Sequence, residues 1–152
     1  MQARDPNFAQ RVRESFALQG AMRTLGASLA EIEPGRVVIA MAHRPELTQQ
    51  HGLIHAGIVA AALDSACGFA AFTLMPADAG VLTIEFKINL LAPARGPQLR
   101  FEGLVTKGGR TISVVDGKAW QFDPAQGDAA PKLVATLTAT VMTVLGRDDV
   151  RH

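Results

Sequence analysis

The sequence has one cysteine, no tyrosine and one tryptophan among its 152 residues. With Cys67 alone, the chain can form neither an internal disulfide nor a metal site built from several cysteines, so Cys67 is interpreted as a small core residue. Neither sign of charge is in excess, because 15 Lys and Arg face 14 Asp and Glu for a net charge of +1. That balance gives no reason to expect nucleic acid or an anionic membrane as a partner, and we expect no bound metal.

A secretion leader is also missing from the sequence, because no apolar stretch follows Met1–Pro6, and we expect a cytoplasmic protein. Hydrophobic residues make up 48% of the chain and charged residues 19%, which is enough apolar material for a folded core. The length predicts one domain over 1–152. Residues 54–75 are long enough to span a membrane, but Asp64 in their middle would cost about 2.5–3.5 kcal/mol there and favours a buried helix instead.

Apolar patterns divide the chain into a short N-terminal helix over about 6–20, six strands and a long helix over 55–75. Strands are predicted at 27–32, 36–42, 82–90, 98–106, 111–122 and 132–145. A polar loop is expected at 123–130 and a frayed tail after 146. The long helix must be covered on most sides, which predicts an α+β fold: a curved antiparallel sheet wrapped around a central helix.

Strand 82–90 has the clearest alternation in the sequence. Its apolar face is predicted to carry Leu82, Ile84, Phe86, Ile88 and Leu90. The opposite face then carries Thr83, Glu85, Lys87 and Asn89. This period of two predicts a half-buried antiparallel strand.

Asp64 is the first functional candidate, because it is the only acidic or basic residue between 56 and 75. A carboxylate in such surroundings loses hydration, and a partner or a raised pKa must offset the loss. On a helical projection its neighbours are all small: Gly57, Ala60, Ala61, Cys67, Gly68 and Ala71. Larger residues, including Phe69, are expected to face the sheet. The Asp64 face is therefore predicted to admit a ligand or a second chain; the structural alternative is a close helix pair with Asp64 bound to a neighbour's amides.

The start of the long helix is the second candidate, because its free backbone N–H groups form a natural oxyanion site around Ala56 and Gly57. His55 taken alone is better explained as a helix cap or a satisfied core histidine, and His51 as a loop residue. Eight residues separate Ala56 from Asp64, a rise of about 12 Å. One substrate carbonyl cannot contact both groups of a single chain, so a site that uses both must be shared between two subunits.

The segments His51–Gly57, Leu63–Ser65, Leu82–Ala94 and Gly109-Arg110 together resemble the hotdog-fold acyl-CoA thioesterases of the phenylacetate-degradation, or PaaI-like, type. The resemblance extends over about residues 20–145. It implies a hotdog fold, a homodimer that pairs into a homotetramer, and hydrolysis of an acyl-CoA without any cofactor beyond the coenzyme A of the substrate.

The resemblance also implies roles for single residues. Asp64 would act as general base or nucleophile, the Ala56 amide with Gly57 nearby as oxyanion donor, and Thr83 as the hydroxyl that orients water. Gln49 stands where the family has Asn, and Ala56 where it has Gly. The other site residues expected from the motifs are His55 in the catalytic segment and, for coenzyme A, His51, Gly52, Lys107, Gly109 and Arg110.

Two other functions remain open at this point. The chain could bind an acyl-CoA without cleaving it, as a sensor or carrier, although no DNA-binding segment accompanies it. A lyase on the same fold is a third reading, but the expected Asp/His pairing is not evident in the sequence.

Overall fold

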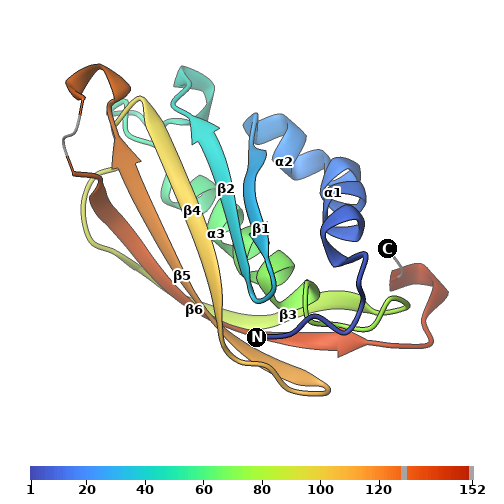
Figure 1. Ribbon diagram of the computed structural model, residues 1–152. Helices are drawn as coiled ribbons and strands as arrows, with labels where there is room; N and C mark the ends of the chain where they lie inside the picture. The colour runs from blue at the N-terminus through green and yellow to red at the C-terminus, as the bar shows by residue number, and fades with distance from the viewer. Residues whose placement is uncertain (128–129, 151–152) are drawn as a thin grey trace.

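The six strands of the chain form one antiparallel sheet in the order β1-β2-β4-β5-β6-β3. The computed structural model describes residues 1–127 and 130–150, and Figure 1 shows the sheet curving around the long helix α3. The elements are α1 (Phe8–Leu18), α2 (Gly20–Leu25), β1 (Ser28–Glu33), β2 (Arg36–Ala42), α3 (Ala56–Phe72), β3 (Gly80–Leu90), β4 (Gln98–Lys107), β5 (Ile112–Phe122) and β6 (Lys132–Val144). The predicted α+β architecture, a sheet wrapped around a central helix, is confirmed.

Helix α3 lies against the concave face of the sheet, where Leu63 and Ala66 are fully buried. Two glycines allow this close approach: a Cβ at Gly103 would lie 2.4 Å from the Ala66 carbonyl oxygen, and one at Gly117 would lie 3.0 Å from Cys67 Sγ. Cys67 is therefore a core residue, as predicted, and burial raises the pKa of its thiol. Its expected place on the open face around Asp64 is wrong, because the side chain points to β5.

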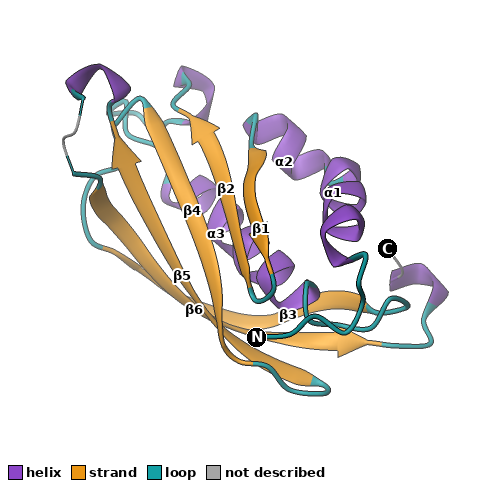
Figure 2. Cartoon of the chain, in the orientation of Figure 1, coloured by secondary structure: helices purple, strands orange, loops and turns teal. Residues whose placement is uncertain are grey.

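The N-terminal region forms two helices where the sequence predicted one, because the chain breaks at Gln19 between α1 and α2. These helices are set beside α3 and β1 (Figure 2). Phe69 was expected to face the sheet, but its ring packs against Phe16 of α1, with ring centroids 5.7 Å apart. The covering helices supply an apolar surface of their own, so large residues of α3 need not all face strands.

Arg11 joins α1 to the end of α3 by donating hydrogen bonds to the carbonyl oxygens of Phe72, Met75 and Pro76 at 2.9–3.2 Å. Its guanidinium also pairs with Asp5 at 2.9 Å, and both side chains are less than one tenth exposed. The arginine thus binds the last carbonyl of α3, which has no intrahelical partner, and two carbonyls of the turn that follows the helix.

Strand β3 departs from the predicted alternation because a bulge falls between Thr83 and Glu85, with Ile84 as the extra residue. Thr83 opposes Val141, and Phe86 opposes Ala139, both buried on β6. Directly opposed residues lie on the same face, so Thr83 faces α3 together with Phe86, Ile88 and Leu90. The sequence pattern had placed Thr83 on the other face.

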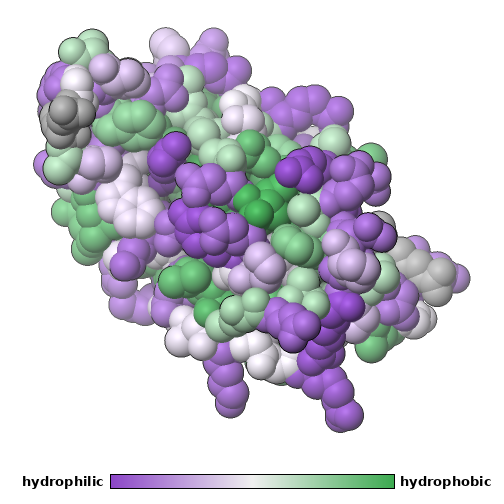
Figure 3. Space-filling view, in the orientation of Figure 1, coloured by the Kyte–Doolittle hydropathy of each residue, from purple (hydrophilic) through white to green (hydrophobic). Residues whose placement is uncertain are grey.

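The apolar side chains of β3 are also more exposed than a half-buried strand should be. Leu82 is 41% exposed, Ile84 51%, Phe86 41% and Leu90 54%. The reason is topological: β3 is a sheet edge, paired with β6 on one side only. By contrast, the outer face of the sheet is mainly hydrophilic, with smaller hydrophobic patches between (Figure 3).

The end of the described chain returns to the start of β3. Residues Asp148–Val150 form a 3-10 turn where the sequence predicted fraying, and the Val150 carbonyl lies against Gly80, which has no Cβ to obstruct it. The expected loop 123–130 and tail after 146 include residues 128–129 and 151–152, which lie outside the described residues. Across 1–127 and 130–150, no helix combines the length and apolar character needed to cross a bilayer.

Candidate active site

Two cavities border β3, one near each end of the strand. The first, about 250 Å³, is called the carboxylate cavity and is lined by Gln19, Asp64, Ser65, Gly68, Phe69, Val81, Leu82 and Thr83. The second, about 360 Å³, is called the amide cavity and is lined by Gln49, Leu53, Ile54, Ala56, Val59, Leu90, Leu91, Ala92, Pro93, Ala94 and Val134. Each cavity holds a different part of the predicted catalytic machinery.

In the carboxylate cavity, Asp64 is half-buried on α3 and accepts a hydrogen bond from Thr83 Oγ1 on β3, 2.8 Å from Oδ1. Burial raises the pKa of Asp64, and the Thr83 hydroxyl counteracts part of that rise by stabilising the charged form. The bulge at Ile84 makes this contact possible, because it turns Thr83 towards the helix. Oδ2 has no hydrogen-bond donor among the described residues, so it can accept a proton from water.

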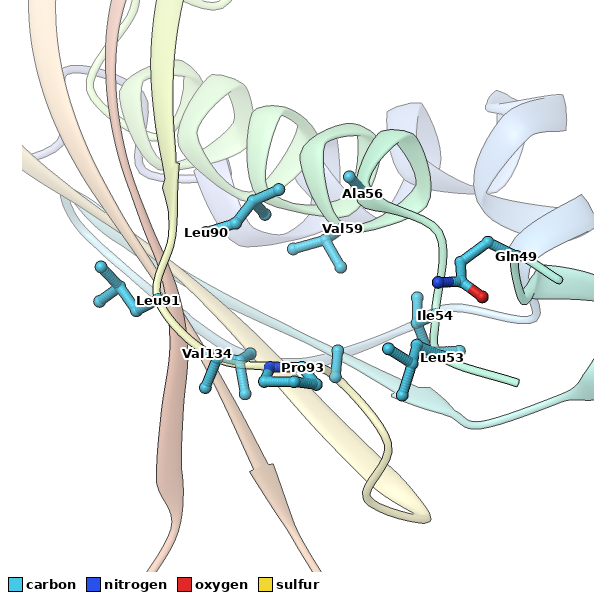
Figure 4. Close-up of a pocket in the computed structure, with 11 residues that line it drawn as sticks. Gln49, Leu53, Ile54, Ala56, Val59, Leu90, Leu91, Pro93 and Val134 are labelled. Atoms are coloured by element: carbon cyan, nitrogen blue, oxygen red, sulfur yellow. The ribbon is translucent and has the colours of Figure 1, made fainter. Parts of the chain in front are cut away.

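The amide cavity lies at the start of α3, where Val59 and Leu90 project into the same space from helix and strand (Figure 4). His55 is the N-cap of the helix: its Nδ1 accepts the Gly57 N–H at 2.9 Å. The Gly57 amide is therefore occupied, which argues against the predicted second oxyanion donor. The Ala56 N–H has no acceptor among the residues described, and Ala56 itself lines the cavity.

Gln49 reaches the amide cavity from the loop before α3. Its side-chain oxygen accepts the backbone N–H of His51, which leaves the amide nitrogen as the free end. In Figure 4 this nitrogen points towards Ile54 and the oxygen points away. A carbonyl oxygen in this cavity could thus be approached by two donors, the Ala56 N–H and the Gln49 NH₂.

The short loop that precedes α3 is held by its own backbone. Gly52 has φ +76°, a left-handed conformation that favours glycine, and its N–H donates to the Gln49 carbonyl at 3.0 Å. His43 Nε2 lies 3.1 Å from the Gly52 carbonyl oxygen. Neither Gly52 nor His51 lines the amide cavity, so their part is to shape the loop that carries Gln49.

Of the residues expected to meet coenzyme A, Lys107 is the last residue of β4, and Gly109 and Arg110 lie in the turn between β4 and β5. Lys107 and Arg110 are exposed, and the Gly109 N–H donates to Ser113 Oγ at 3.2 Å. None of the three lines either cavity within the described chain. Their predicted role requires a substrate that extends well beyond the cavities.

Sequence reasoning missed Gln19 and Ser65, which meet at the rim of the carboxylate cavity. Ser65 Oγ donates to Gln19 Oε1 at 3.3 Å. Gln19 enters the site because it lies between α1 and α2 and packs beside α3, and no motif in the sequence marks that packing. No three His, Cys, Asp or Glu side chains in residues 1–127 and 130–150 are grouped as metal ligands would be.

Comparison with known proteins gives a consistent result. A family model described as Thioesterase superfamily matches residues 51–127. The sequence is 33% identical over 112 residues to Putative esterase SSO2140 of Saccharolobus solfataricus, covering 74% of this chain and 77% of that protein. A thioesterase family protein from Silicibacter pomeroyi, known by its crystal structure, is similar with 50% identity and a TM-score of 0.87, covering 91% of this chain and 99% of that chain.

The fold is also shared with the E. coli PaaI protein from the phenylacetic acid degradation operon, at a TM-score of 0.78 and 17% identity. That match covers 91% of this chain and 94% of that chain. At such identity the likeness concerns the fold alone, which is the hotdog arrangement of a curved sheet around one long helix.

Proposed function

The chain belongs to the thioesterase superfamily, and from this membership and the geometry of its two cavities we propose that it hydrolyses an acyl-CoA thioester to a free acid and coenzyme A. The observation that carries the proposal is the separation of the two predicted catalytic groups. The carboxylate and the oxyanion donors lie in separate cavities at opposite ends of one exposed strand edge.

An antiparallel pairing of β3 with the β3 of a second copy would bring the two cavities together. The amide cavity borders Leu90, and the carboxylate cavity borders Leu82 and Thr83. Around a two-fold axis, the last residues of one β3 lie beside the first residues of the other. Each dimer then has two composite sites, and such dimers pair into the proposed tetramer.

In each composite site, the thioester oxygen accepts hydrogen bonds from the Ala56 N–H and the Gln49 amide of one subunit. Asp64 of the other subunit takes a proton from water, which Thr83 helps to orient, and the water oxygen bonds to the carbonyl carbon. The resulting oxyanion is stabilised by the two donors. It then collapses, the carbon–sulfur bond breaks, and the thiolate leaves and is protonated.

Direct attack by the Asp64 carboxylate is the other route, with an anhydride intermediate that water then opens. Label found in the protein after a single turnover in heavy-oxygen water identifies this nucleophilic route. General-base catalysis puts the label into the free acid alone, whereas nucleophilic attack followed by hydrolysis at the Asp64 carbonyl leaves it in the protein.

The experiment that tests the function is thiol release by the purified protein from a panel of acetyl-, octanoyl-, palmitoyl- and phenylacetyl-CoA. We expect turnover of at least one member, and Asp64→Asn should abolish it while the protein stays folded and still binds the substrate. Tight binding of acyl-CoA without any turnover by the wild type would instead favour the sensor or carrier.

A further inference from the structure

The carboxylate cavity contains a surface that the chemistry does not use. Gly68 follows Asp64 by four residues on α3, so it lies on the same side of the helix, about 6 Å further along. It is buried, yet a Cβ built on it would have no heavy atom within 4 Å. The space beside Gly68 thus belongs to the carboxylate cavity and is empty of protein atoms, unlike the tight surroundings of Gly103 and Gly117 on the sheet.

The wall next to this space is rigid. Phe69 is 2% exposed and is held between Phe16 and Phe72, with ring centroids 5.7 and 6.2 Å away. Such an aromatic cluster leaves little freedom for the Phe69 ring to move aside. The remaining apolar lining comes from Val81 and Leu82 at the start of β3.

We propose that the carboxylate cavity receives the acyl group of the substrate, and that Gly68 is the residue that sets the size of the acyl group accepted. The inference rests on the proposed function, because a carbonyl carbon attacked at Asp64 has its next acyl atoms within one helical turn of the carboxylate. Those atoms lie beside Gly68. Coenzyme A, which is large and anionic, extends towards the amide cavity and solvent.

The volume indicates the class of acyl group. A cavity of about 250 Å³ is of the order of the size of an octanoyl or phenylacetyl group, whereas the longer palmitoyl chain would extend beyond it. The proposal therefore takes a medium-chain or aryl-acetyl thioester as the substrate class.

The experiment is a graded series, Gly68→Ala and Gly68→Val, assayed for kcat/KM with acetyl-, octanoyl- and phenylacetyl-CoA. One methylene in an apolar pocket changes discrimination by roughly 10- to 200-fold. Gly68→Val should therefore lower kcat/KM for octanoyl- and phenylacetyl-CoA at least tenfold relative to acetyl-CoA, with Gly68→Ala between it and the wild type. Gly20→Val, the same change in an exposed helix position outside both cavities, should keep the wild-type profile.

A second readout does not depend on turnover. In the Asp64→Asn background, calorimetry should show that Gly68→Val weakens the binding of octanoyl-CoA and leaves that of acetyl-CoA unchanged. An equal loss for every acyl group, in either measurement, would overturn the role of Gly68. So would a loss of the dimer in light scattering, because the empty space would then belong to the partner subunit. If the wild type binds these thioesters with the expected selectivity but cleaves none, the proposed hydrolysis is wrong, whereas the role of Gly68 in setting the size of the acyl group stands.

Discussion

The two edges of the sheet are built differently. At one edge, β1 is short, has a bulge between Leu29 and Glu31, and is packed against α1. Glu31 on this strand forms ion pairs with Arg36 at 2.7 Å and Arg100 at 3.7 Å. At the other edge, β3 is 11 residues long and exposes Leu82, Ile84, Phe86 and Leu90.

Short length, bulges, charge and a covering helix are the means by which proteins protect a sheet edge from pairing. β1 combines all of them. β3 has a bulge and two charged residues, but it is long and leaves four apolar side chains 41–54% exposed. An edge left open beside both cavities is best explained by a partner strand. Under the proposed function, the difference between the edges is that β3 pairs with a second copy and β1 does not, and each prediction below tests that contrast.

The largest effect is expected from charging the open edge. Ile84→Lys combined with Phe86→Lys should convert dimers into monomers, because two buried ammonium groups would oppose the pairing of β3 with its copy. The rate of thioester hydrolysis should fall on the order of 10²-fold or more. In a monomer, the carboxylate and the oxyanion donors stay in separate cavities and cannot act on one thioester. Light scattering and thiol release measure the two effects.

Leu104→Lys is the matched control, because Leu104 is 48% exposed but lies on the interior strand β4. It should leave the dimer and its activity in place. A double-lysine variant that remains dimeric and active would show that β3 is not the interface.

The second largest effect is expected from removing the oxyanion donor at the start of α3, which lies in one of the two cavities beside the open edge. Ala56→Pro should fold, because Ala56 is the first residue of α3 and His55 already has the extended ψ of 137° that precedes proline. It removes the Ala56 N–H, and kcat should fall on the order of 10²-fold.

Subunit exchange between Ala56→Pro and Asp64→Asn then tests the shared site. Half of the dimers in an equal mixture are mixed, and each mixed dimer has one intact site of two, so activity should recover to about a quarter of the wild type. If mass spectrometry shows exchange but activity stays at the level of the parents, both groups act within one chain and the composite site is wrong.

A substitution in α1, the helix that covers β1, should lower the free energy of unfolding clearly and affect the rate of hydrolysis less. Arg11→Leu should destabilise the fold by about 3 kcal/mol, because it leaves Asp5 and the carbonyls at and just after the end of α3 without their partner. Urea unfolding measures the change. Arg13→Leu, at an exposed position of the same helix, should change little; equal losses in the two variants would contradict the role assigned to Arg11.

The smallest effect is a pH-dependent gain in stability from Asp64→Asn. Folding raises the pKa of Asp64, so the folded protein favours the protonated form, and the charged form is a cost above the folded pKa. The variant should thus have a higher Tm than the wild type near pH 8. The difference should vanish as the pH falls below the ordinary carboxyl value of about 3.9.

Thermal scans over this pH range measure the effect, with Asp78→Asn, an exposed carboxylate, as the control. A difference that grows on acidification would mean that folding lowers the pKa of Asp64. Desolvation would then not be the dominant influence on the pKa of Asp64.

Much of the fold was predictable because apolar periodicity is a local property. The strand predicted at 36–42 is β2 without change, and the strand predicted at 82–90 is β3 apart from its first two residues. The missed features are those that periodicity does not encode. The bulge at Ile84 results from pairing with β6, and the short helix α2 lies in residues 20–25, where the sequence predicted no element.

For the site, the sequence identified Asp64 through its apolar surroundings and Ala56 through its place at a helix start. It also gave their separation along α3, which required a second chain for any site that uses both. It could not show that the Gly57 N–H is occupied by His55, or that Gln49 presents its amide nitrogen to the cavity. Those facts depend on side-chain orientations.

The sequence by itself determined the kind of fold, the buried carboxylate and the helix-start amide, because composition, period and spacing are properties of the chain. Only the tertiary structure decided that Thr83 turns inward to Asp64, that Gln19 and Gly68 border the same cavity, and that β3 is the edge left open. The physical reason is that each of these depends on which segments, distant in sequence, pack against one another.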